Sequence, residues 1–221
     1  GTLFAKADVD TGSKIGMYNA TVLVARANAK GSMDAYMDAD EIDANSVNLS
    51  NEYKAESNAQ TGSAGALKAG LISAGGNVAY ATTESSGKTV FGAARGGNIR
   101  GSVNISNLGR VSAKALGKTA KVTIEVVGIA VNVINADLKA KQDTQFNYGG
   151  DLTIGGGVNI NSEFVKEGIY GKADAQTGAA SGTDLSIVGG SVNSAKASST
   201  TENKLTVTGK GSKVMTVGGD F

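Results

Sequence analysis

A five-residue segment recurs along the chain, and its spacing limits the folds that the chain can adopt. The segment reads VNLSN at 47–51, VNISN at 103–107 and VNINS at 158–162, at steps of 56 and 55 residues. Two further markers, a Thr before a small residue and an Ala-containing triplet, advance by similar steps. A fixed period of this size is typical of stacked repeat proteins. The sequence therefore predicts one repeat segment over residues 1–221, built from four units of about 55 residues.

The composition indicates that these repeats are made of β-strands. The chain contains no Pro, although average usage predicts about 5%. Pro cannot donate to a strand ladder and is tolerated mainly at sheet edges, bulges and turns. Its absence is typical of a backbone that is hydrogen-bonded on both sides. With 32 Gly and only 5% aromatic residues, any interior must be thin and built from small side chains.

The spacing inside each unit predicts a parallel β-solenoid. The markers divide a unit into steps of about 18 residues, and each step is interpreted as one coil. Between residues 122 and 140 the alternation of apolar residues changes phase twice, which predicts corners at Val126–Val127 and Val133–Ile134. A similar change predicts a corner at Val24–Ala25. We expect about eleven or twelve coils, stacked into a rod of roughly 55 Å.

The repeated segment also predicts which side chains face the interior. In VNISN, alternation places Val103 and Ile105 inward, Asn104 outward and Asn107 at a corner. Stacked coils allow an Asn at one level to bond the equivalent residue of the next level. We expect such a ladder at Asn51 or Asn107, with solvated turn residues as the alternative. The Gly clusters at 149–151 and 155–157 lack the Lys-Ser/Thr pair of a phosphate loop, so we interpret them as corners.

Missing residue types exclude several classes of chemistry. Without Cys there is no disulfide or thiolate metal site, and without His the commonest general base and metal ligand is absent. The formal net charge of +1 favours neither nucleic acid nor anionic lipid as a partner. The most apolar segment, residues 122–134, is interrupted and too short to span a bilayer. We expect no cofactor, no nucleic acid and no membrane span.

The repeats resemble the passenger repeats of the large filamentous adhesins of Gram-negative bacteria. Within this class, the repeats are most similar to those of the fusobacterial leukotoxin family and its adhesin relatives. The resemblance covers essentially the whole chain and is carried by TGSAGALKAGLISAGGNVAYATTE, IRGSVNISNLGRVSAKA and VTIEVVGIAVNVINADLKAKQ. It implies a right-handed parallel β-helix, exported by a two-partner route to the cell surface or the medium. It also implies a role in adhesion to host cells or toxicity towards them.

The resemblance further implies where the segment belongs and what it meets. The family's export domain lies at the N-terminus of the full protein, and this sequence shows no match to it. We therefore interpret the chain as a piece of a longer protein, and secretion is inferred from the relatives. The expected partners are the host cell surface, through an unidentified receptor or glycan, and the neighbouring β-helix repeats of the same chain.

Charged residues supply two weak candidates for a site. An acidic stretch contains Asp38, Asp40, Glu41 and Asp43. These carboxylates would suit Ca²⁺ or a polysaccharide-cleaving β-helix enzyme, but a solvated outer wall is the alternative. Arg95 and Arg100 flank Gly-rich turns and would suit an anionic sugar, although isolated cations are common at such turns.

Aromatic residues mark the places where the repeat is broken. We consider a binding wall made of Phe91, Arg95, Arg100, Phe146, Tyr148, Phe164 and Tyr170. Buried plugs are the alternative for the aromatic members of this set.

Three functions remain after these exclusions. A structural or display segment of a surface adhesin or leukotoxin needs no catalytic group and fits the repeated walls best. A glycan- or receptor-binding module would use a wall that breaks the repeat. A polysaccharide-cleaving β-helix enzyme fits least, because no pair of carboxylates coincides with a basic residue on a recurring wall. We therefore expect a non-catalytic protein that is secreted or lies on the bacterial outer surface.

Overall fold

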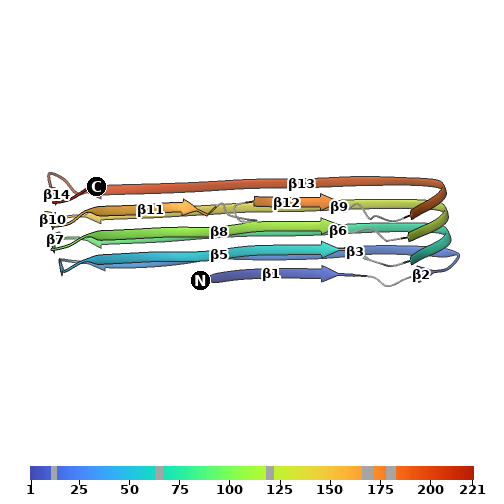
Figure 1. Ribbon diagram of the computed structural model, residues 1–221, viewed down its shortest axis with the longest axis horizontal. Coiled ribbons are helices and arrows are strands. Elements are labelled where there is room, and N and C mark those ends of the chain that lie inside the picture. The colour runs from blue at the N-terminus through green and yellow to red at the C-terminus, as the bar shows by residue number, and fades with distance from the viewer. Residues whose placement is uncertain (11–13, 63–66, 118–121, 166–171, 178–182) are drawn as a thin grey trace.

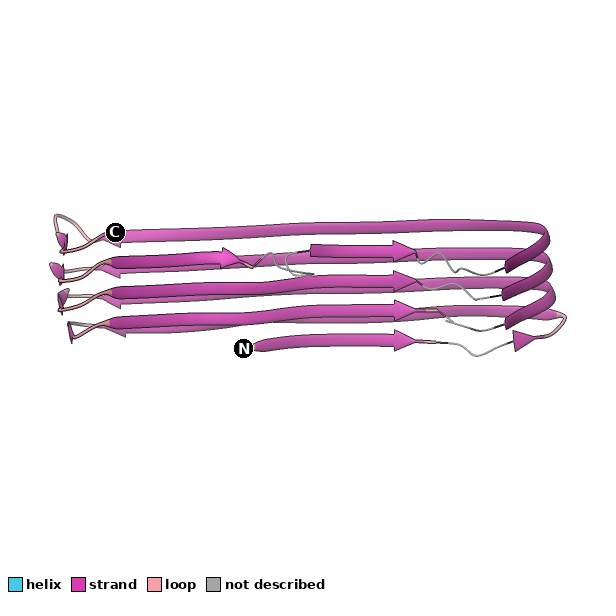
Figure 2. Cartoon of the chain, in the orientation of Figure 1, coloured by secondary structure: helices cyan, strands magenta, loops and turns pink. Residues whose placement is uncertain are grey.

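Parallel strands make up almost all of the described chain. The computed structural model describes residues 1–10, 14–62, 67–117, 122–165, 172–177 and 183–221. These residues contain strands and short turns but no helix (Figure 2). The strands form three sheets, called here wall A, wall B and wall C, and every pairing is parallel. The all-β class and the parallel stacking expected of a β-solenoid are therefore confirmed.

Each wall holds one stretch of every repeat. Wall A contains β1 (Thr2–Val9), β5 (Val47–Thr61), β8 (Val103–Gly117), β11 (Val158–Phe164) and β12 (Lys172–Thr177). Wall B contains β2 (Lys14–Ile15), β3 (Tyr18–Ala39), β6 (Leu67–Ala93), β9 (Val122–Tyr148) and β13 (Thr183–Gly209). Wall C contains β4 (Ile42–Ala44), β7 (Gly97–Ile99), β10 (Leu152–Ile154) and β14 (Met215–Val217). The chain passes through walls A, B and C in turn, and one such passage is called a level (Figure 1).

The strand register shows that one level takes a whole unit of the repeat. Val47 pairs with Val103, and Val103 pairs with Val158. Residues one 55-residue unit apart are therefore direct neighbours in wall A. The expectation of about eleven or twelve coils of 18 residues is wrong, because among the described residues wall C holds four strands, one for each level. The markers inside a unit fall along long strands and do not separate coils.

The long strands also change the expected shape. β9 and β13 contain 27 residues each, which corresponds to about 90 Å of extended chain. Four levels at about 4.8 Å spacing cover only about 15 Å from the first to the last. The molecule is accordingly longest along its strands (Figure 1). The rod of roughly 55 Å along the stacking direction, predicted from the sequence, is not formed.

Only the first predicted corner of residues 122–140 coincides with a break in the ladder. The pairing of β9 with its neighbours skips Val126, and wall B curves near the start of its long strands (Figure 1). The corner at Val133–Ile134 is absent, because pairing there is continuous. The corner at Val24–Ala25 is absent for the same reason.

The interior between walls A and B is narrow. Its central cluster consists mainly of Ala, with Tyr53, Val111, Ile134 and Leu138 as its larger members. A second cluster near wall C contains larger side chains, namely Ile42, Val47, Phe91, Ala93, Ile99, Val103, Ile105, Phe146, Leu152, Ile154 and Val158. Apolar burial stabilises by about 25 cal/mol per Å², so a single level with small side chains cannot offset the entropy of ordering and the levels must stack.

Buried Asn side chains connect the levels. Asn107 is fully buried and donates through Nδ2 to Gly87 O at 3.2 Å and Thr144 Oγ1 at 3.1 Å. It accepts from Asn51 Nδ2 at 3.3 Å. The predicted Asn ladder is confirmed, and the solvated alternative is wrong. The expected corner is also wrong, since Asn107 lies inside β8 with its side chain towards wall B. Val103 and Ile105 point inward as predicted.

Glycine allows adjacent levels to approach closely at the corners beside wall C. Residues 149–150 and 155–156 form bends, which confirms the interpretation of both Gly clusters. A Cβ on Gly150 would overlap Arg95 O of the neighbouring level. Gly96 and Gly97 have positive φ values of 79° and 133°, a region that side chains disfavour. These corners therefore require Gly for both space and backbone conformation.

Candidate functional site

Two of the predicted binding-wall aromatics lie in the core. Phe91 and Phe146 pair across β6 and β9, and they are 0% and 1% exposed. Their rings stack with centroids 4.6 Å apart. Neither ring can contact a molecule outside the protein. For these two residues the alternative of buried plugs is confirmed.

The other aromatic candidates do not complete an exposed wall. Tyr148 is half-buried and presents a ring edge to Phe146, with centroids 6.5 Å apart. Phe164 packs against the central Ala-rich cluster. Tyr170 lies outside the described residues. The described aromatics mainly fill the interior, and Phe91 and Phe146 occupy equivalent positions of two successive units. These two residues therefore follow the repeat, and the expectation that they break it is wrong.

The two Arg candidates form ion pairs with the acidic stretch one level away. Arg95 Nη2 lies 3.5 Å from Asp40 Oδ2, and Arg100 Nη2 lies 2.9 Å from Asp43 Oδ1. Arg100 Nη1 also donates to Asn45 Oδ1 at 3.3 Å. All of these groups are exposed, so each ion pair contributes little to stability. The structure brings the Arg residues and the acidic stretch together, a link that the sequence analysis did not make.

The acidic stretch has no metal-binding geometry. Within the described part of the chain, no group of three or more acidic side chains is close enough to hold a metal ion. Asp38 and Glu41 are exposed, while Asp40 and Asp43 contact Arg. The stretch is thus placed as the solvated-wall alternative describes. Among the same described residues, no helix has the length and hydropathy needed to cross a membrane.

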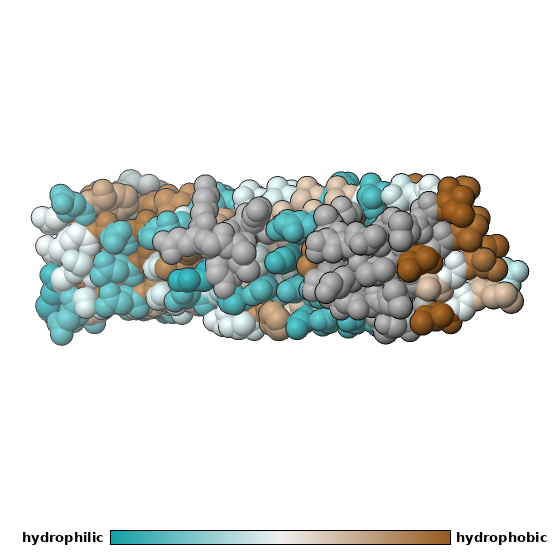
Figure 3. Space-filling model, turned by 45° about the vertical axis from the view of Figure 1, so that its right-hand side comes forward, coloured by the Kyte–Doolittle hydropathy of each residue, from teal (hydrophilic) through white to brown (hydrophobic). Residues whose placement is uncertain are grey.

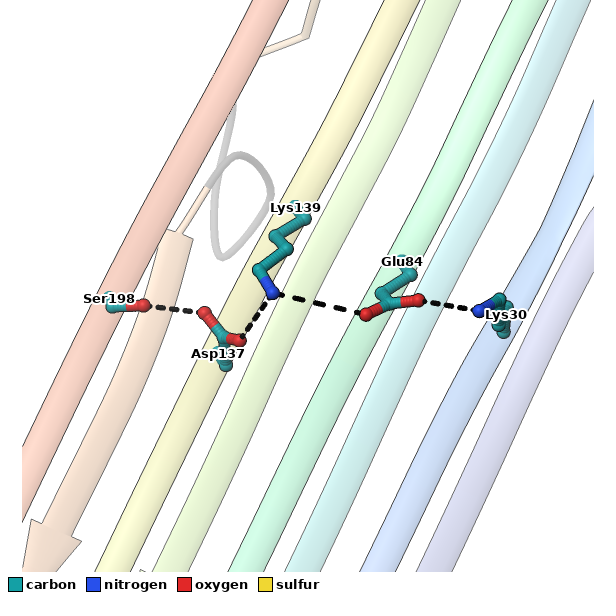
Figure 4. Close-up of polar contacts among 5 residues, drawn as sticks. All are labelled: Lys30, Glu84, Asp137, Lys139 and Ser198. Carbon is teal, nitrogen blue, oxygen red and sulfur yellow. Dashed lines mark hydrogen bonds and ion pairs between the residues drawn. The ribbon is translucent and has the colours of Figure 1, made fainter.

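A polar network crosses all four levels on the outer face of wall B (Figure 4). Glu84 lies 3.0 Å from Lys30 Nζ and 4.0 Å from Lys139 Nζ. Lys139 Nζ also lies 3.6 Å from Asp137, which accepts from Ser198 Oγ at 2.5 Å. The hydrogen bond from Lys30 and its positive charge lower the pKa of Glu84, which keeps this carboxylate ionised. The network joins neighbouring strands through side chains as well as backbone.

The first part of wall B carries apolar side chains on its outer face. The pairing aligns Val22, Gly76, Val131 and Val192 in one row, and Ala20, Ala74, Ile129 and Gly190 in another. Ile129 is 60% exposed and Val131 is 41% exposed. Hydrophobic residues gather at the same end in the space-filling view (Figure 3). Contiguous apolar patches mark interaction surfaces more often than scattered apolar residues do.

Sequence reasoning missed this surface because it assigned these residues to the interior. The alternation of the residues that follow could have revealed the exposed surface. Ile134, Ala136 and Leu138 are all buried, and alternation without a corner then turns Val131 and Ile129 outward. Asn132 takes the inward position instead, because it accepts from Asn77 at 2.9 Å and donates to Asn193 at 2.6 Å.

The hydroxyl of Tyr53 is an ionisable group that lies in the interior. Desolvation by burial raises the pKa of this hydroxyl well above its usual range, and the facing Gln142 and Ser85 side chains lower it by less. Tyr53 is 1% exposed, so it cannot reach a molecule in solution. We assign it to the core.

Comparison of the chain with models of protein families, with curated proteins and with solved structures finds no match.

Proposed function

We propose that this chain is a structural and display segment of a secreted or surface-exposed bacterial filamentous adhesin or leukotoxin. It acts in host-cell adhesion or toxicity without catalysing a reaction. In this proposal residues 1–221 form one β-helix segment of a longer repeat protein that is exported by a two-partner route. The helix is right-handed, as the resemblance implies and as nearly all crossovers between parallel strands are.

One observation carries the proposal, namely that equivalent residues form continuous columns through the levels. Val47, Val103 and Val158 form one inner column, and Ala27, Ala81 and Ala136 form another. The interior and the backbone ladders hold the fold, so the outer positions are free to vary. A fold of this kind is suited to presenting a broad surface.

The outer side chains support a structural role as well. The network from Lys30 to Ser198 and the pairs made by Arg95 and Arg100 run between levels. Such contacts link neighbouring levels and use charges that a ligand site would need to leave available.

A cell-binding experiment tests the proposal against its alternatives. Fluorescently labelled chain is added to leukocytes and to epithelial cells, and its folding is checked by far-UV circular dichroism. The proposal expects no saturable binding by this segment alone and no release of reducing sugar from host glycans. Saturable binding that unlabelled chain competes away would overturn the structural role. Sugar release would overturn its non-catalytic character.

A display segment should also carry an inserted peptide. Gly211 lies in a turn after β13, and a Cβ added to it would have no other atom within 4 Å. A short epitope inserted there should bind its antibody while the circular dichroism spectrum stays unchanged. Loss of strand signal on insertion would contradict tolerance of the outer turns.

The second candidate is a receptor-binding module, which the apolar outer face of wall B favours. Aliphatic side chains such as Ile129 and Val131 fit a protein receptor better than a glycan. Replacing both with Ser should abolish saturable cell binding if this candidate is right. The structural proposal expects the double variant and the parent chain to behave alike.

A further inference from the structure

An apolar side chain is exposed at the same bend of wall B in all four levels. Among the described residues, the ladder of wall B is interrupted at one place near the start of each long strand. The apolar residues at this interruption, called here the ridge, are Met17, Leu71, Val126 and Ile187. They are 65%, 50%, 38% and 80% exposed, in that order. By contrast, the outer column that contains Glu84 changes between Lys, Glu and Thr from level to level.

The backbone explains why the ridge side chains are left at the surface. Met17 O accepts hydrogen bonds from Leu71 N at 3.1 Å and from Ile72 N at 3.0 Å, so two residues of β6 face one residue of the neighbouring level. This is the arrangement of a β-bulge, which bends the strand. Wall B curves at this end of the molecule (Figure 1), and apolar residues gather there in the space-filling view (Figure 3). The ridge therefore lies at one end of the longest dimension.

No charged residue follows the ridge for a whole stretch of each strand. The nine residues that begin with each ridge residue include no Asp, Glu, Lys or Arg. These stretches are 17–25, 71–79, 126–134 and 187–195. The residues just before the ridge include two Lys and two acidic residues, so neither sign of charge dominates there. They are Lys14, Lys68, Glu125 and Asp184. A partner of the ridge is therefore apolar and needs no net charge.

The size of the ridge argues against a protein partner. Its four levels cover about 15 Å and two residues along each strand cover about 7 Å, so its footprint is on the order of 100 Å². A stable protein–protein interface buries about 800 Å² on each partner. A bilayer needs no area of that size and no matching groove, because lipids rearrange around side chains that project from one end of a molecule. Aliphatic side chains also suit the boundary between headgroups and acyl chains.

We propose that the ridge contacts the surface of a lipid bilayer with uncharged or zwitterionic headgroups. The ridge side chains enter the headgroup region while the strands stay outside it. Further repeats of a longer chain stack above and below these levels and leave the end of wall B uncovered. The inference rests on the ridge and not on the proposed function. Partitioning into lipid increases with the amount of lipid and unlabelled chain does not compete it away, which distinguishes it from saturable receptor binding.

Flotation with phosphatidylcholine vesicles measures the contact, with a matched pair of double variants. The 221-residue chain should float with the vesicles, and added salt should leave the bound fraction unchanged because the ridge has no charge to screen. Met17→Ser with Ile187→Ser should weaken partitioning by at least about tenfold, since each methylene lost from the lipid costs about fourfold. The control is Phe4→Ser with Val214→Ser, at residues that are 59% and 60% exposed outside wall B. It should change partitioning by less than about twofold.

A spin-label measurement shows which end of the molecule meets the lipid. The chain contains no Cys, so Met17→Cys and Val214→Cys each provide a single site for a nitroxide. On addition of vesicles the label at 17 should become protected from a water-soluble relaxation agent, and the label at 214 should not. Far-UV circular dichroism checks that every variant is folded.

Several outcomes overturn the inference. They are a chain that does not float, equal partitioning of the two double variants, and protection of the label at 214 in place of the label at 17. Flotation that requires anionic lipid and is lost on adding salt would place the contact on charged outer residues. Self-association without lipid that is lost in the ridge variant would assign the ridge to a second copy of the chain, and it also overturns the inference.

Discussion

The buried Asn ladder gives the sharpest test of the fold, because the same pentapeptide holds its control. Asn107 is fully buried and its side chain makes three hydrogen bonds. These bonds join β8 to β5 in wall A and to β6 and β9 in wall B. Asn104, three residues earlier, donates to Asn48 Oδ1 at 2.8 Å but lies on the exposed face. Each Asn bonds its equivalent in the neighbouring level. The two differ in burial and in the number of bonds.

The expected loss follows from those bonds. A hydrogen bond contributes about 0.5–1.5 kcal/mol net, so Asn107→Ala should lower the free energy of unfolding by about 2–4 kcal/mol. Asn104→Ala removes one exposed bond and should change it by less than about 0.5 kcal/mol. Asn51→Ala should resemble Asn107→Ala, because Asn51 also donates to Met33 O at 2.8 Å. The double variant should lose less than the sum, since the shared bond is lost only once.

Urea unfolding followed by far-UV circular dichroism measures these losses. The slope of the free energy with urea should stay the same for all variants, so the midpoints can be compared directly. Equal losses for Asn107→Ala and Asn104→Ala would refute the claim that burial of the ladder stabilises the fold. Strict additivity in the double variant would refute the direct contact between Asn51 and Asn107.

Three further predictions use the same unfolding assay. Phe91→Ala removes a fully buried, stacked ring and should cost about 3–5 kcal/mol; a cost below about 1 kcal/mol would contradict the packing. Tyr53 has its pKa raised above its ordinary value of 10.0 in the folded state, so stability should be constant below that pH and fall as pH rises beyond it. Tyr53→Phe should flatten this alkaline loss, and an unchanged profile would argue against burial of the hydroxyl. Gly96→Ala should destabilise more than Gly211→Ala, because both have positive φ but only the Cβ at Gly96 would overlap Asp151; equal midpoints would contradict close stacking at that corner.

The sequence predicted the stacking of the repeat but not the length of a coil. The columns through Val103 and Ile105 follow from the repeat period alone. In a parallel stack each residue pairs with the equivalent residue of the next unit, so the period determines its neighbour. The coil length does not follow in the same way. Markers at about 18 residues mark corners only if the strands between them are short, and β9 is a single strand of 27 residues. Alternation is the same in a long strand and in two short ones.

The surfaces were harder to predict because hydrophobicity does not determine burial alone. Ile129 is apolar and exposed, whereas Asn132 is polar and buried. Asn132 tolerates the interior because the stack supplies an Asn partner on each side, a property of neighbouring levels that one strand does not reveal. For the aromatic candidates the sequence left a binding wall and buried plugs open, and the stacking of Phe91 on Phe146 in neighbouring levels places both in the core. Both cases depend on contacts between residues about 55 positions apart.

The width of a level decides how far such a chain can reach. About 55 residues advance the stack by only about 4.8 Å, whereas the same number in an α-helix would span about 80 Å. Adding repeats thus increases the short dimension of the molecule, along the stacking direction, and leaves its longest dimension unchanged. Each added level instead contributes a fresh strip of side chains about as long as the molecule itself. A change in repeat number would consequently alter the area of the outer walls far more than the longest dimension of the molecule.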